Sequence, residues 1–547
     1  MSITESNLAP TGYDCVVAVT QDSINDLLMQ YLYPGLPETV LCYVYDSNNN
    51  AVAVDYGQFQ AQVNGTDPFS IPAGTAMTDA RVQALNAANF AFAIQAKLGI
   101  PSDVPPSKLP PIVSLQPGQS SVQYALTFSE FEAAALPREQ NQVTWFYQSQ
   151  GDATCWSFSG PVSLNLQAAS FSSLPAAVQA QLQGMGNPNQ FSVQQLYLDL
   201  NSSALEQGFQ FQNLPQDSAL NTFMANDFVG TYWKALGGGE VLGYGAQQTS
   251  GVTGTGLAVT DLNFYVPPAV GSEGAPLTLN YLCATNNDAL PGTGNANFGW
   301  NWIEPNETGQ YNGVVALNRN TFAGYLSKAL AGYVSTNCYL PKVQVKLKGA
   351  IPEYSWSMTA GQMPTISLAD NGGTFLTILY EPTESEDQAG LHGDLGQMKL
   401  GTSYSLTVSA SGTQMTIVQH LTVYCYIRHL ATSASGNVVD IVITDTYSFG
   451  VNEQGGLVIS ASSAPPVNTS KVPKANGFLN FWAPVNSLAS DVETWAKSIA
   501  ATNLQDIPAA AMQSFVFPGG ATFSFADVAF SDSQDLVSHI VYLGVGR

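Results

Sequence analysis

The side chains best suited to metal or acid–base chemistry, the histidines, are few and scattered. The chain has four, His392, His420, His429 and His539, all in its carboxy-terminal half. Imidazole is the commonest metal ligand, but several ligands must converge on one ion. His420 and His429 lie on one expected strand at an odd spacing, so they face opposite sides of it. No Cys or His cluster has zinc spacing either, and the sequence predicts no metal site.

Three glutamates, Glu381, Glu384 and Glu386, stand close enough in the sequence to suggest a general acid and base. The Pro, Thr and Ser residues around them are more typical of a solvated loop. The chain also has no Gly-x-Ser-x-Gly elbow for a nucleophile and no Gly-Lys-Ser/Thr phosphate loop. We therefore predict a protein that is not an enzyme and that carries no cofactor.

Lys342, Lys346 and Lys348 are the densest group of cations, three of only 16 basic residues. The segment 342–348 alternates, so the lysines share one face of an expected strand and the apolar residues share the other. One interpretation is contact with an anionic head group or membrane surface, worth about 1 kcal/mol per lysine. The other is that lysines on an exposed edge strand keep sheets from pairing edge to edge. Both interpretations stay open.

The overall charge excludes one class of partner. With 40 acidic against 16 basic residues the net charge is −24, which repels nucleic acid. It also repels anionic membranes overall, so any membrane contact is expected to be peripheral and to use a local basic patch. Charged residues make up only 10% of the chain, against about 25% in ordinary soluble proteins. Uncharged polar residues must therefore cover the surface, which is typical of β-rich proteins.

Compartment signals are weak. The first residues lack a basic region followed by an apolar core, and no stretch approaches 18 consecutive apolar residues. We expect neither a signal peptide nor a transmembrane segment, which leaves a cytoplasmic protein or one exported by a leaderless route. The six cysteines have mostly apolar, alternating neighbours and are interpreted as small buried hydrophobes: Cys15, Cys42, Cys155, Cys283, Cys338 and Cys425.

The elements that position these side chains become clear when the chain is compared with itself. A short apolar strand, a polar cluster and an amphipathic helix occur at 13–32 and again at 311–330, an offset of 298 residues. The polar clusters are plausible helix caps, and the apolar residues fall at i, i+3, i+4 and i+8, which places one stripe on each helix. The stripes are Ile24, Leu27, Leu28 and Leu32 in the first copy, and Phe322, Tyr325, Leu326 and Leu330 in the second.

A second pair of similar segments follows in the same order. Leu174–Ala177 resembles Ile507–Ala510, and each precedes an alternating stretch, 191–198 and 523–530. Two matches predict a tandem duplication, with a first module at 1–205 and a second at 301–547. The segment between them, 206–300, is expected to connect the modules through one amphipathic helix, 217–236, followed by Gly-, Asn- and Pro-rich loops and short strands.

Alternation predicts strands elsewhere, over 90–98 and 415–423, although an Ala-rich helix also fits the first of these. The capping-box pattern Ser490–Glu493 predicts one more helix near the end of the chain.

The opening and closing segments resemble a known family. The strand, cap and helix of 13–32 are similar to the start of tubular lipid-binding (TULIP) modules. The segment 517–542 looks like the carboxy-terminal signature of a bacterial and fungal branch that includes accessory proteins encoded beside clostridial neurotoxins, and whose members include phosphoinositide binders. The resemblance implies a strand-dominated α+β fold of tandem TULIP-like modules, each a helix wrapped by a strongly curved antiparallel sheet. It supplies no catalytic or head-group motif.

The function that this resemblance implies is non-enzymatic lipid binding, in a toxin-associated or defence factor. Acyl chains would lie in an apolar groove along the two helix stripes, although a filled core would produce the same stripes. The expected partner is lipid or another apolar small molecule, and the sequence names no protein partner. The alternative is a structural or adhesive β-protein, an assembly subunit or carbohydrate-binding surface protein, which also fits the uncharged, Asn-, Gln- and Tyr-rich composition.

Overall fold

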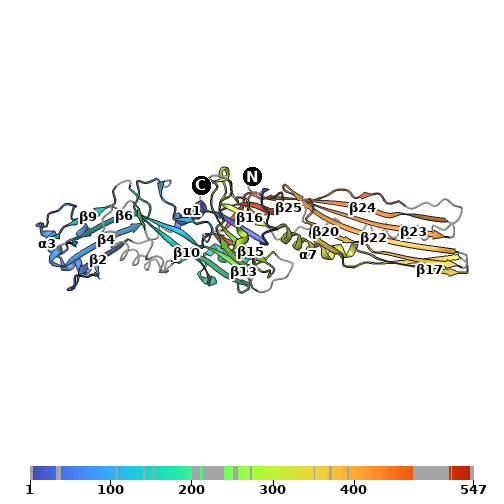
Figure 1. Cartoon of the computed structure of the whole chain (residues 1–547), viewed down its shortest axis with the longest axis horizontal. Helices are drawn as coiled ribbons and strands as arrows, with labels where there is room; N and C mark the ends of the chain where they lie inside the picture. Colours follow the sequence, from blue (N-terminus) through green and yellow to red (C-terminus); the bar gives the residue numbers. More distant parts are fainter. Residues whose placement is uncertain are drawn as a thin grey trace.

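The chain is a strand-dominated α+β protein, with 51% of its residues in strands, 16% in helices and a sheet curled into a half-barrel. The computed structural model describes residues 4–31, 38–105, 108–139, 142–151, 154–185, 187–199, 210–212, 239–249, 257–271, 274–349, 351–368, 373–390, 393–429, 432–471, 516–518, 520 and 522–542. The molecule is elongated, and a central sheet lies between two wings (Figure 1). The predicted fold class is confirmed at this level.

The first wing is an eleven-stranded sheet in the order β27-β13-β11-β10-β6-β4-β2-β3, with β12, β5 and β9 paired at its sides. Its strands are β2 (Thr39–Tyr45), β3 (Ala51–Val54), β4 (Phe90–Leu98), β5 (Val113–Leu115), β6 (Ser121–Ala135), β9 (Phe146–Ser149), β10 (Ser157–Ala169), β11 (Phe191–Asp199), β12 (Gln210–Gln212), β13 (Gly239–Gln248) and β27 (Val516–Pro518). The segment 90–98 is thus a strand, as its alternation predicted. β27 comes from the end of the chain and pairs with β13.

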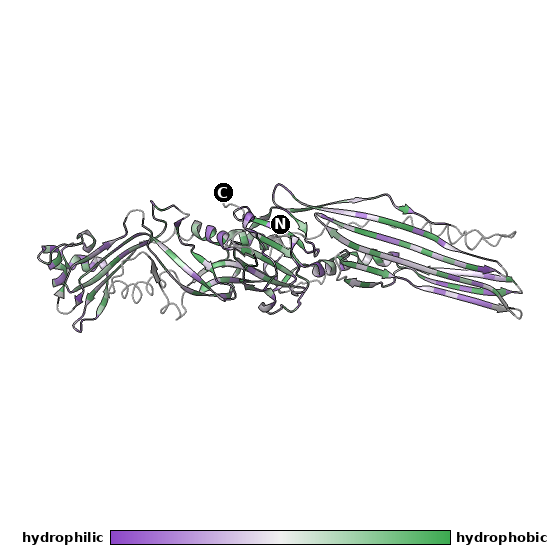
Figure 2. Cartoon of the chain, turned by 45° about the horizontal axis from the view of Figure 1, so that its top comes forward, coloured by the Kyte–Doolittle hydropathy of each residue, from purple (hydrophilic) through white to green (hydrophobic). Residues whose placement is uncertain are grey.

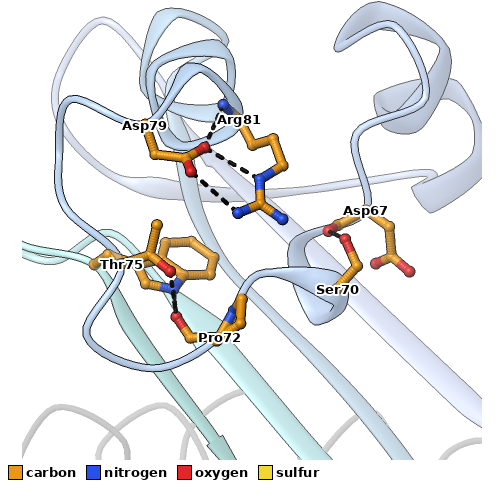
Figure 3. Close-up of polar contacts among 7 residues, drawn as sticks. Asp67, Ser70, Pro72, Thr75, Asp79 and Arg81 are labelled. Atoms are coloured by element: carbon orange, nitrogen blue, oxygen red, sulfur yellow. Dashed lines mark hydrogen bonds and ion pairs between the residues drawn. The ribbon is translucent and has the colours of Figure 1, made fainter.

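The outer end of the first wing is closed by the short helices α2 (Tyr56–Gln62), η3 (Pro68–Ser70) and α3 (Ala80–Ala87), each capped by an aspartate side chain. In Figure 3 Asp79 caps α3 and also holds the Arg81 guanidinium through Nε and Nη2, at 3.1 and 3.0 Å. Pro72 accepts from Thr75 at 2.7 Å in the same loop. The caps satisfy helix N–H groups that would otherwise lack partners. These helices cover a separate apolar cluster on β2, β4 and β6.

The second wing is an eight-stranded sheet, β19-β20-β22-β23-β24-β25, with β21 and β26 at its sides. Its strands are β19 (Thr365–Leu368), β20 (Leu376–Tyr380), β21 (Thr383–Gly390), β22 (Gly393–Ser411), β23 (Gln414–His429), β24 (Thr432–Val451), β25 (Leu457–Ser463) and β26 (Val467–Asn468). Every second residue of β23 is buried from Met415 to His429, and the long strands of this wing carry alternating hydropathy bands in Figure 2. One face of the sheet is therefore apolar and covered.

The expectation that Glu384 and Glu386 lie in a loop was wrong. Both belong to β21, which pairs with β22 in the register Glu384↔Leu400 and Glu386↔Met398. Ladder hydrogen bonds to β22 override the local preference of the Pro, Thr and Ser residues for a loop. A separate hairpin, β17 (Leu340–Lys348) and β18 (Ile351–Thr359), lies against this part of the wing.

The central sheet combines strands from the beginning, middle and end of the chain, in the order β14-β15-β1-β16-β30-β28, with β29 beside β30. They are β1 (Cys15–Thr20), β14 (Val259–Tyr265), β15 (Thr278–Thr285), β16 (Gly313–Leu317), β28 (Phe523–Phe525), β29 (Ala529–Phe530) and β30 (Leu536–Tyr542). The range 206–300, expected to connect modules, supplies β13 to the first wing and β14 and β15 to this sheet. The module boundaries at 205 and 300 stay a prediction.

The strand–helix openings are confirmed as elements and meet at the middle of this sheet. β1 leads into α1 (Gln21–Tyr31), β16 leads into α7 (Arg319–Asn337), and the two strands pair antiparallel. Their register places Val17 opposite Val315, and 315 − 17 is again 298. The pairing of the two strands is therefore centred on Val17 and Val315, which occupy equivalent positions in the two repeats.

Side-chain contacts across this pair are reciprocal. Asp14 accepts from Thr321 in the first turn of α7 and from the Thr285 backbone, at 2.7 Å to the latter. Asn312, which is 298 residues after Asp14, donates to Ser23 in the first turn of α1 at 2.9 Å and accepts from the Tyr542 backbone. Ser23 and Thr321 are also 298 apart. Each half thus anchors the helix of the other.

The second sequence match did not hold. The stretch 191–198 lies in β11 of the first wing, whereas 523–530 forms β28 and β29 of the central sheet. Alternation marks a half-buried strand in any sheet, so it does not distinguish these two positions. Residues 507–510 and the helices expected at 217–236 and after Ser490 lie outside the described residues.

Candidate functional site

The first helix stripe is positioned by the cap at Thr20. The Thr20 hydroxyl accepts from the Ser23 backbone N–H at 3.2 Å, which fixes the first turn of α1 directly after β1. Ile24, Leu27 and Leu28 are then buried in the main apolar cluster. The fourth predicted residue, Leu32, lies outside the described residues. The predicted stripe therefore faces the interior over its described length.

The second stripe is longer than the sequence pattern indicated. Asn318 caps α7 by accepting from the Asn320 N–H at 2.9 Å. Phe322, Leu326 and Leu330 are buried in the main apolar cluster, and Tyr325 is half-buried against it. Phe322 lies within 6.1 to 6.4 Å of three further aromatic rings, those of Phe375, Phe530 and Phe449. The buried face continues for one more turn beyond the predicted residues, to Val334.

A short polar row interrupts the apolar face of the second wing. The Tyr404 hydroxyl donates to Gln419 at 2.9 Å, and Gln419 donates to Asp445 at 3.4 Å; all three side chains are buried. Ser463 donates to the other oxygen of Asp445 at 2.5 Å. Burial raises the pKa of Tyr404, so its hydroxyl stays protonated and donates. Burial also raises the pKa of Tyr333, on α7, to about 12. These hydrogen bonds fix the alignment of β22, β23 and β24 on an otherwise apolar face of the sheet.

The three lysines lie where the alternation placed them. Lys342, Lys346 and Lys348 are exposed on β17, and Val345 on the opposite face is buried. Lys348 Nζ lies 3.5 Å from Glu353 Oε1, and Lys346 is directly opposite Glu353 in the register. Such an exposed ion pair contributes little to stability.

The histidines stand apart from one another. On β23, His420 is half-buried beside Asp440 at 2.8 Å, while His429 is buried on the other face, where desolvation lowers its pKa. His539 is buried, hydrogen-bonded to Asp527 at 2.8 Å and stacked on Tyr311 at 3.9 Å. Within the described ranges no three His, Cys, Asp or Glu residues are grouped to hold a metal ion. His392 is outside those ranges.

Three surface clefts are described, and none of them is mainly apolar. The largest, about 390 Å³, lies at the first turn of α1 and includes Asp22 and Asp26. Burial and the neighbouring Asp22 raise the pKa of Asp26. The others, about 350 and 260 Å³, lie beside the β22–β23 turn and over β6. The expected acyl-chain groove corresponds to none of these three.

No family model matches the sequence, and no curated protein does either. Solved structures with a similar course of the backbone include P47 from Clostridium botulinum A2, which is 11% identical with a TM-score of 0.41. The match covers 97% of both chains. P47 of Clostridium botulinum E1 has 8% identity and a TM-score of 0.43, covering 96% of this chain and 98% of that one. A lipopolysaccharide binding protein has 9% identity and a TM-score of 0.25, covering 97% and 99%. At TM-scores below 0.5 none of these similarities assigns a function.

Sequence reasoning missed the apolar residues at the tip of the β17–β18 hairpin. Leu347 is 37% exposed and Ile351 is 61% exposed, on either side of a turn through Gly349, whose φ is +68°. The signal was present in the sequence, because a glycine between two alternating segments is typical of a hairpin turn. Along the described part of the chain, no helix is long and apolar enough to cross a membrane.

Proposed function

We propose that this chain is a non-enzymatic lipid-binding protein of the tubular lipid-binding type, in which acyl chains lie between the helices and the sheets. One observation carries the proposal. A single apolar cluster is continuous from the first wing, through the central sheet, into the second wing, and the stripes of both α1 and α7 rest on it. Binding would require only that part of this interior be occupied by acyl chain in place of side chains.

The energetics support tight binding without any catalytic group. Each methylene moved from water into such an interior contributes about 0.8 kcal/mol, so a dozen contribute roughly 10 kcal/mol before the cost of immobilising the ligand. Specificity would come from a few polar groups on the apolar wall. The row Tyr404–Gln419–Asp445 is such a group, since it lies on the inner face of the second wing close to α7.

The reciprocal contacts of Asp14 and Asn312 support the further proposal that the two halves are copies of one module. In this proposal the first copy extends through β14 and β15, because these strands flank β1 as β30 and β28 flank β16. Each copy would then supply one helix and one wing, and so one lipid site.

The test is mass spectrometry of the intact purified protein and of its organic extract, together with uptake of a fluorescent fatty acid. We expect bound lipid, or saturable uptake by the lipid-free protein. Leu28→Asp and Leu326→Asp each place a carboxylate in the buried stripe and should abolish uptake at the site concerned. Leu379→Asp, at a leucine of β20 that is 37% exposed, is the matched control and should leave uptake unchanged.

Circular dichroism of each variant separates loss of the site from loss of the fold. Protein that is uniformly free of lipid and takes up no fatty acid would refute the proposal. Folded Leu28→Asp and Leu326→Asp proteins that load as the parent does would show that the stripes do not line the site.

A further inference from the structure

The outward face of the β17–β18 hairpin is cationic on an otherwise acidic molecule. Cross-strand register puts Lys342, Lys346 and Lys348 on that face together with Ile351, opposite Lys348, and Glu353, opposite Lys346. Among the hairpin's own residues on this face, three cations against one carboxylate give a charge of +2, whereas the whole chain carries −24. The acidic residues beside the hairpin, Glu384, Glu386 and Asp387, belong to the neighbouring strand β21. The exposed pair of Lys348 with Glu353 does not remove this excess.

The tip of the same hairpin is apolar and lies at one end of the elongated molecule (Figure 1). Ile351 and Leu347 flank the turn and are 61% and 37% exposed. Exposed aliphatic side chains beside a turn leave apolar surface in water unless a partner covers it. The lysines lie on β17, which also carries Leu347, so apolar and cationic groups occupy one hairpin.

The structure weakens the second interpretation of the lysines, that they protect an exposed strand edge from pairing with other sheets. The open edge of β17 lies against β21, and the Glu386 carboxylate accepts from the Val345 backbone N–H at 2.9 Å. The edge is thus already engaged by a side chain. The lysines project from the face of the hairpin, not along this edge.

We propose that the β17–β18 hairpin tip docks on an anionic phospholipid bilayer, with Ile351 and Leu347 entering the interface and Lys342, Lys346 and Lys348 meeting the phosphates. The arrangement matches the chemistry of such a surface, which offers negative charge above an apolar layer. It goes beyond the proposed function, because the tip could dock on a bilayer whether or not the interior holds lipid. Each lysine should strengthen binding about fivefold, the equivalent of about 1 kcal/mol.

The experiment is flotation of the full-length protein with vesicles of phosphatidylcholine, with and without phosphatidylserine. Replacing Lys342, Lys346 and Lys348 together by Gln should weaken binding to the anionic vesicles about a hundredfold. The matched control replaces the exposed lysines Lys97, Lys108 and Lys328 by Gln, which gives the same net charge of −27 (−24 − 3) and should change binding far less.

The apolar part of the proposal has its own pair of variants. Ile351→Ser should weaken binding severalfold, while Val467→Ser, at an apolar residue that is 59% exposed elsewhere on the second wing, should not. Binding of the parent should fall as salt is raised toward 0.5 M, because screening shortens the reach of the lysines.

Equal losses in the two triple variants, or binding that ignores salt, would overturn the proposal. So would unchanged vesicle binding of the hairpin triple variant accompanied by self-association, which would show that the lysines keep copies of the chain apart. Fatty-acid uptake by the hairpin variants should equal that of the parent. Vesicle binding without any uptake would refute the proposed function alone, and uptake without vesicle binding would refute the docking alone.

Discussion

Truncating Leu326 to alanine tests whether α7 rests on the interior as described. The side chain is fully buried, on the face of α7 that meets the main apolar cluster. The change removes three carbons, whose transfer from water is worth about 2.4 kcal/mol at about 0.8 kcal/mol each. A residual cavity adds to this, because close-packed neighbours relax only in part. The expected loss in free energy of unfolding is therefore about 3 to 5 kcal/mol.

Urea unfolding followed by circular dichroism would measure this loss, with Leu379→Ala as the control. Leu379 is 37% exposed in the same half of the chain and should cost less than about 1 kcal/mol. The Leu326→Ala variant also reports on function. If a fatty acid chain can fill the cavity, saturating fatty acid should restore about 2 to 3 kcal/mol of the free energy of unfolding. A loss no larger than that of the control would refute the placement of α7. A full loss that fatty acid cannot recover would argue that this part of the stripe is filled core.

Three further predictions follow from other parts of the molecule. Gly313→Ala should prevent stable folding, because the new Cβ would lie 2.1 Å from the backbone oxygen of Ala18. On α7, the Cβ of Gly324→Ala would meet nothing within 4 Å, so this variant should stabilise the protein by about 0.5 to 1 kcal/mol. Thermal melts of both variants check this. Burial opposes ionisation of Asp527, but the interactions with His539 together outweigh it and lower the pKa of this carboxyl group. The stability that the ionised carboxylate contributes is therefore present above the unfolded-state pKa of about 3.9 and is lost as the pH falls through the lower folded-state pKa. Urea titrations should show that Asp527→Asn lowers stability at neutral pH and matches the parent in acid. Five of the six cysteines are buried and none forms a disulfide, so a thiol reagent should modify half-buried Cys155 first in the native protein and all six after unfolding, as counted by intact mass.

Local features were predictable from the sequence because their causes are local. The polar clusters at Thr20 and Asn318 cap the helices that they precede, and period-two alternation placed the lysines of β17 on one face. Sheet membership was not predictable in this way. β27 joins the first wing from the end of the chain, and β14 and β15 complete the central sheet from a range whose loops and short strands were expected only to connect the modules. Which strands pair depends on long-range registers that alternation does not encode.

The same limit explains the error at Glu384 and Glu386. Composition favoured a loop, but β22 is a long strand with an edge available, and pairing with it decided the outcome. Of the candidate site, the stripes of α1 and α7 were predictable, because a helical period of 3.6 marks the buried face directly. Whether that face meets lipid or side chains depends on packing volume, which no sequence period specifies.

The position of β1 between β15 and β16 has a consequence for how the protein is made. Thr20 precedes Gly313 by 293 residues and Leu536 by 516 residues. At typical rates of synthesis, roughly 5 to 20 residues per second, the apolar strand β1 leaves the ribosome roughly 15 to 60 s before β16 exists, and the outer neighbour β30 follows only at the end of translation. Throughout that interval the strand offers unpaired backbone to any passing chain. Ribosome profiling of bound chaperones should therefore find one on the nascent chain from the emergence of β1 until β15 and β16 appear, and stop codons placed before β30 should yield aggregates instead of a folded amino-terminal half.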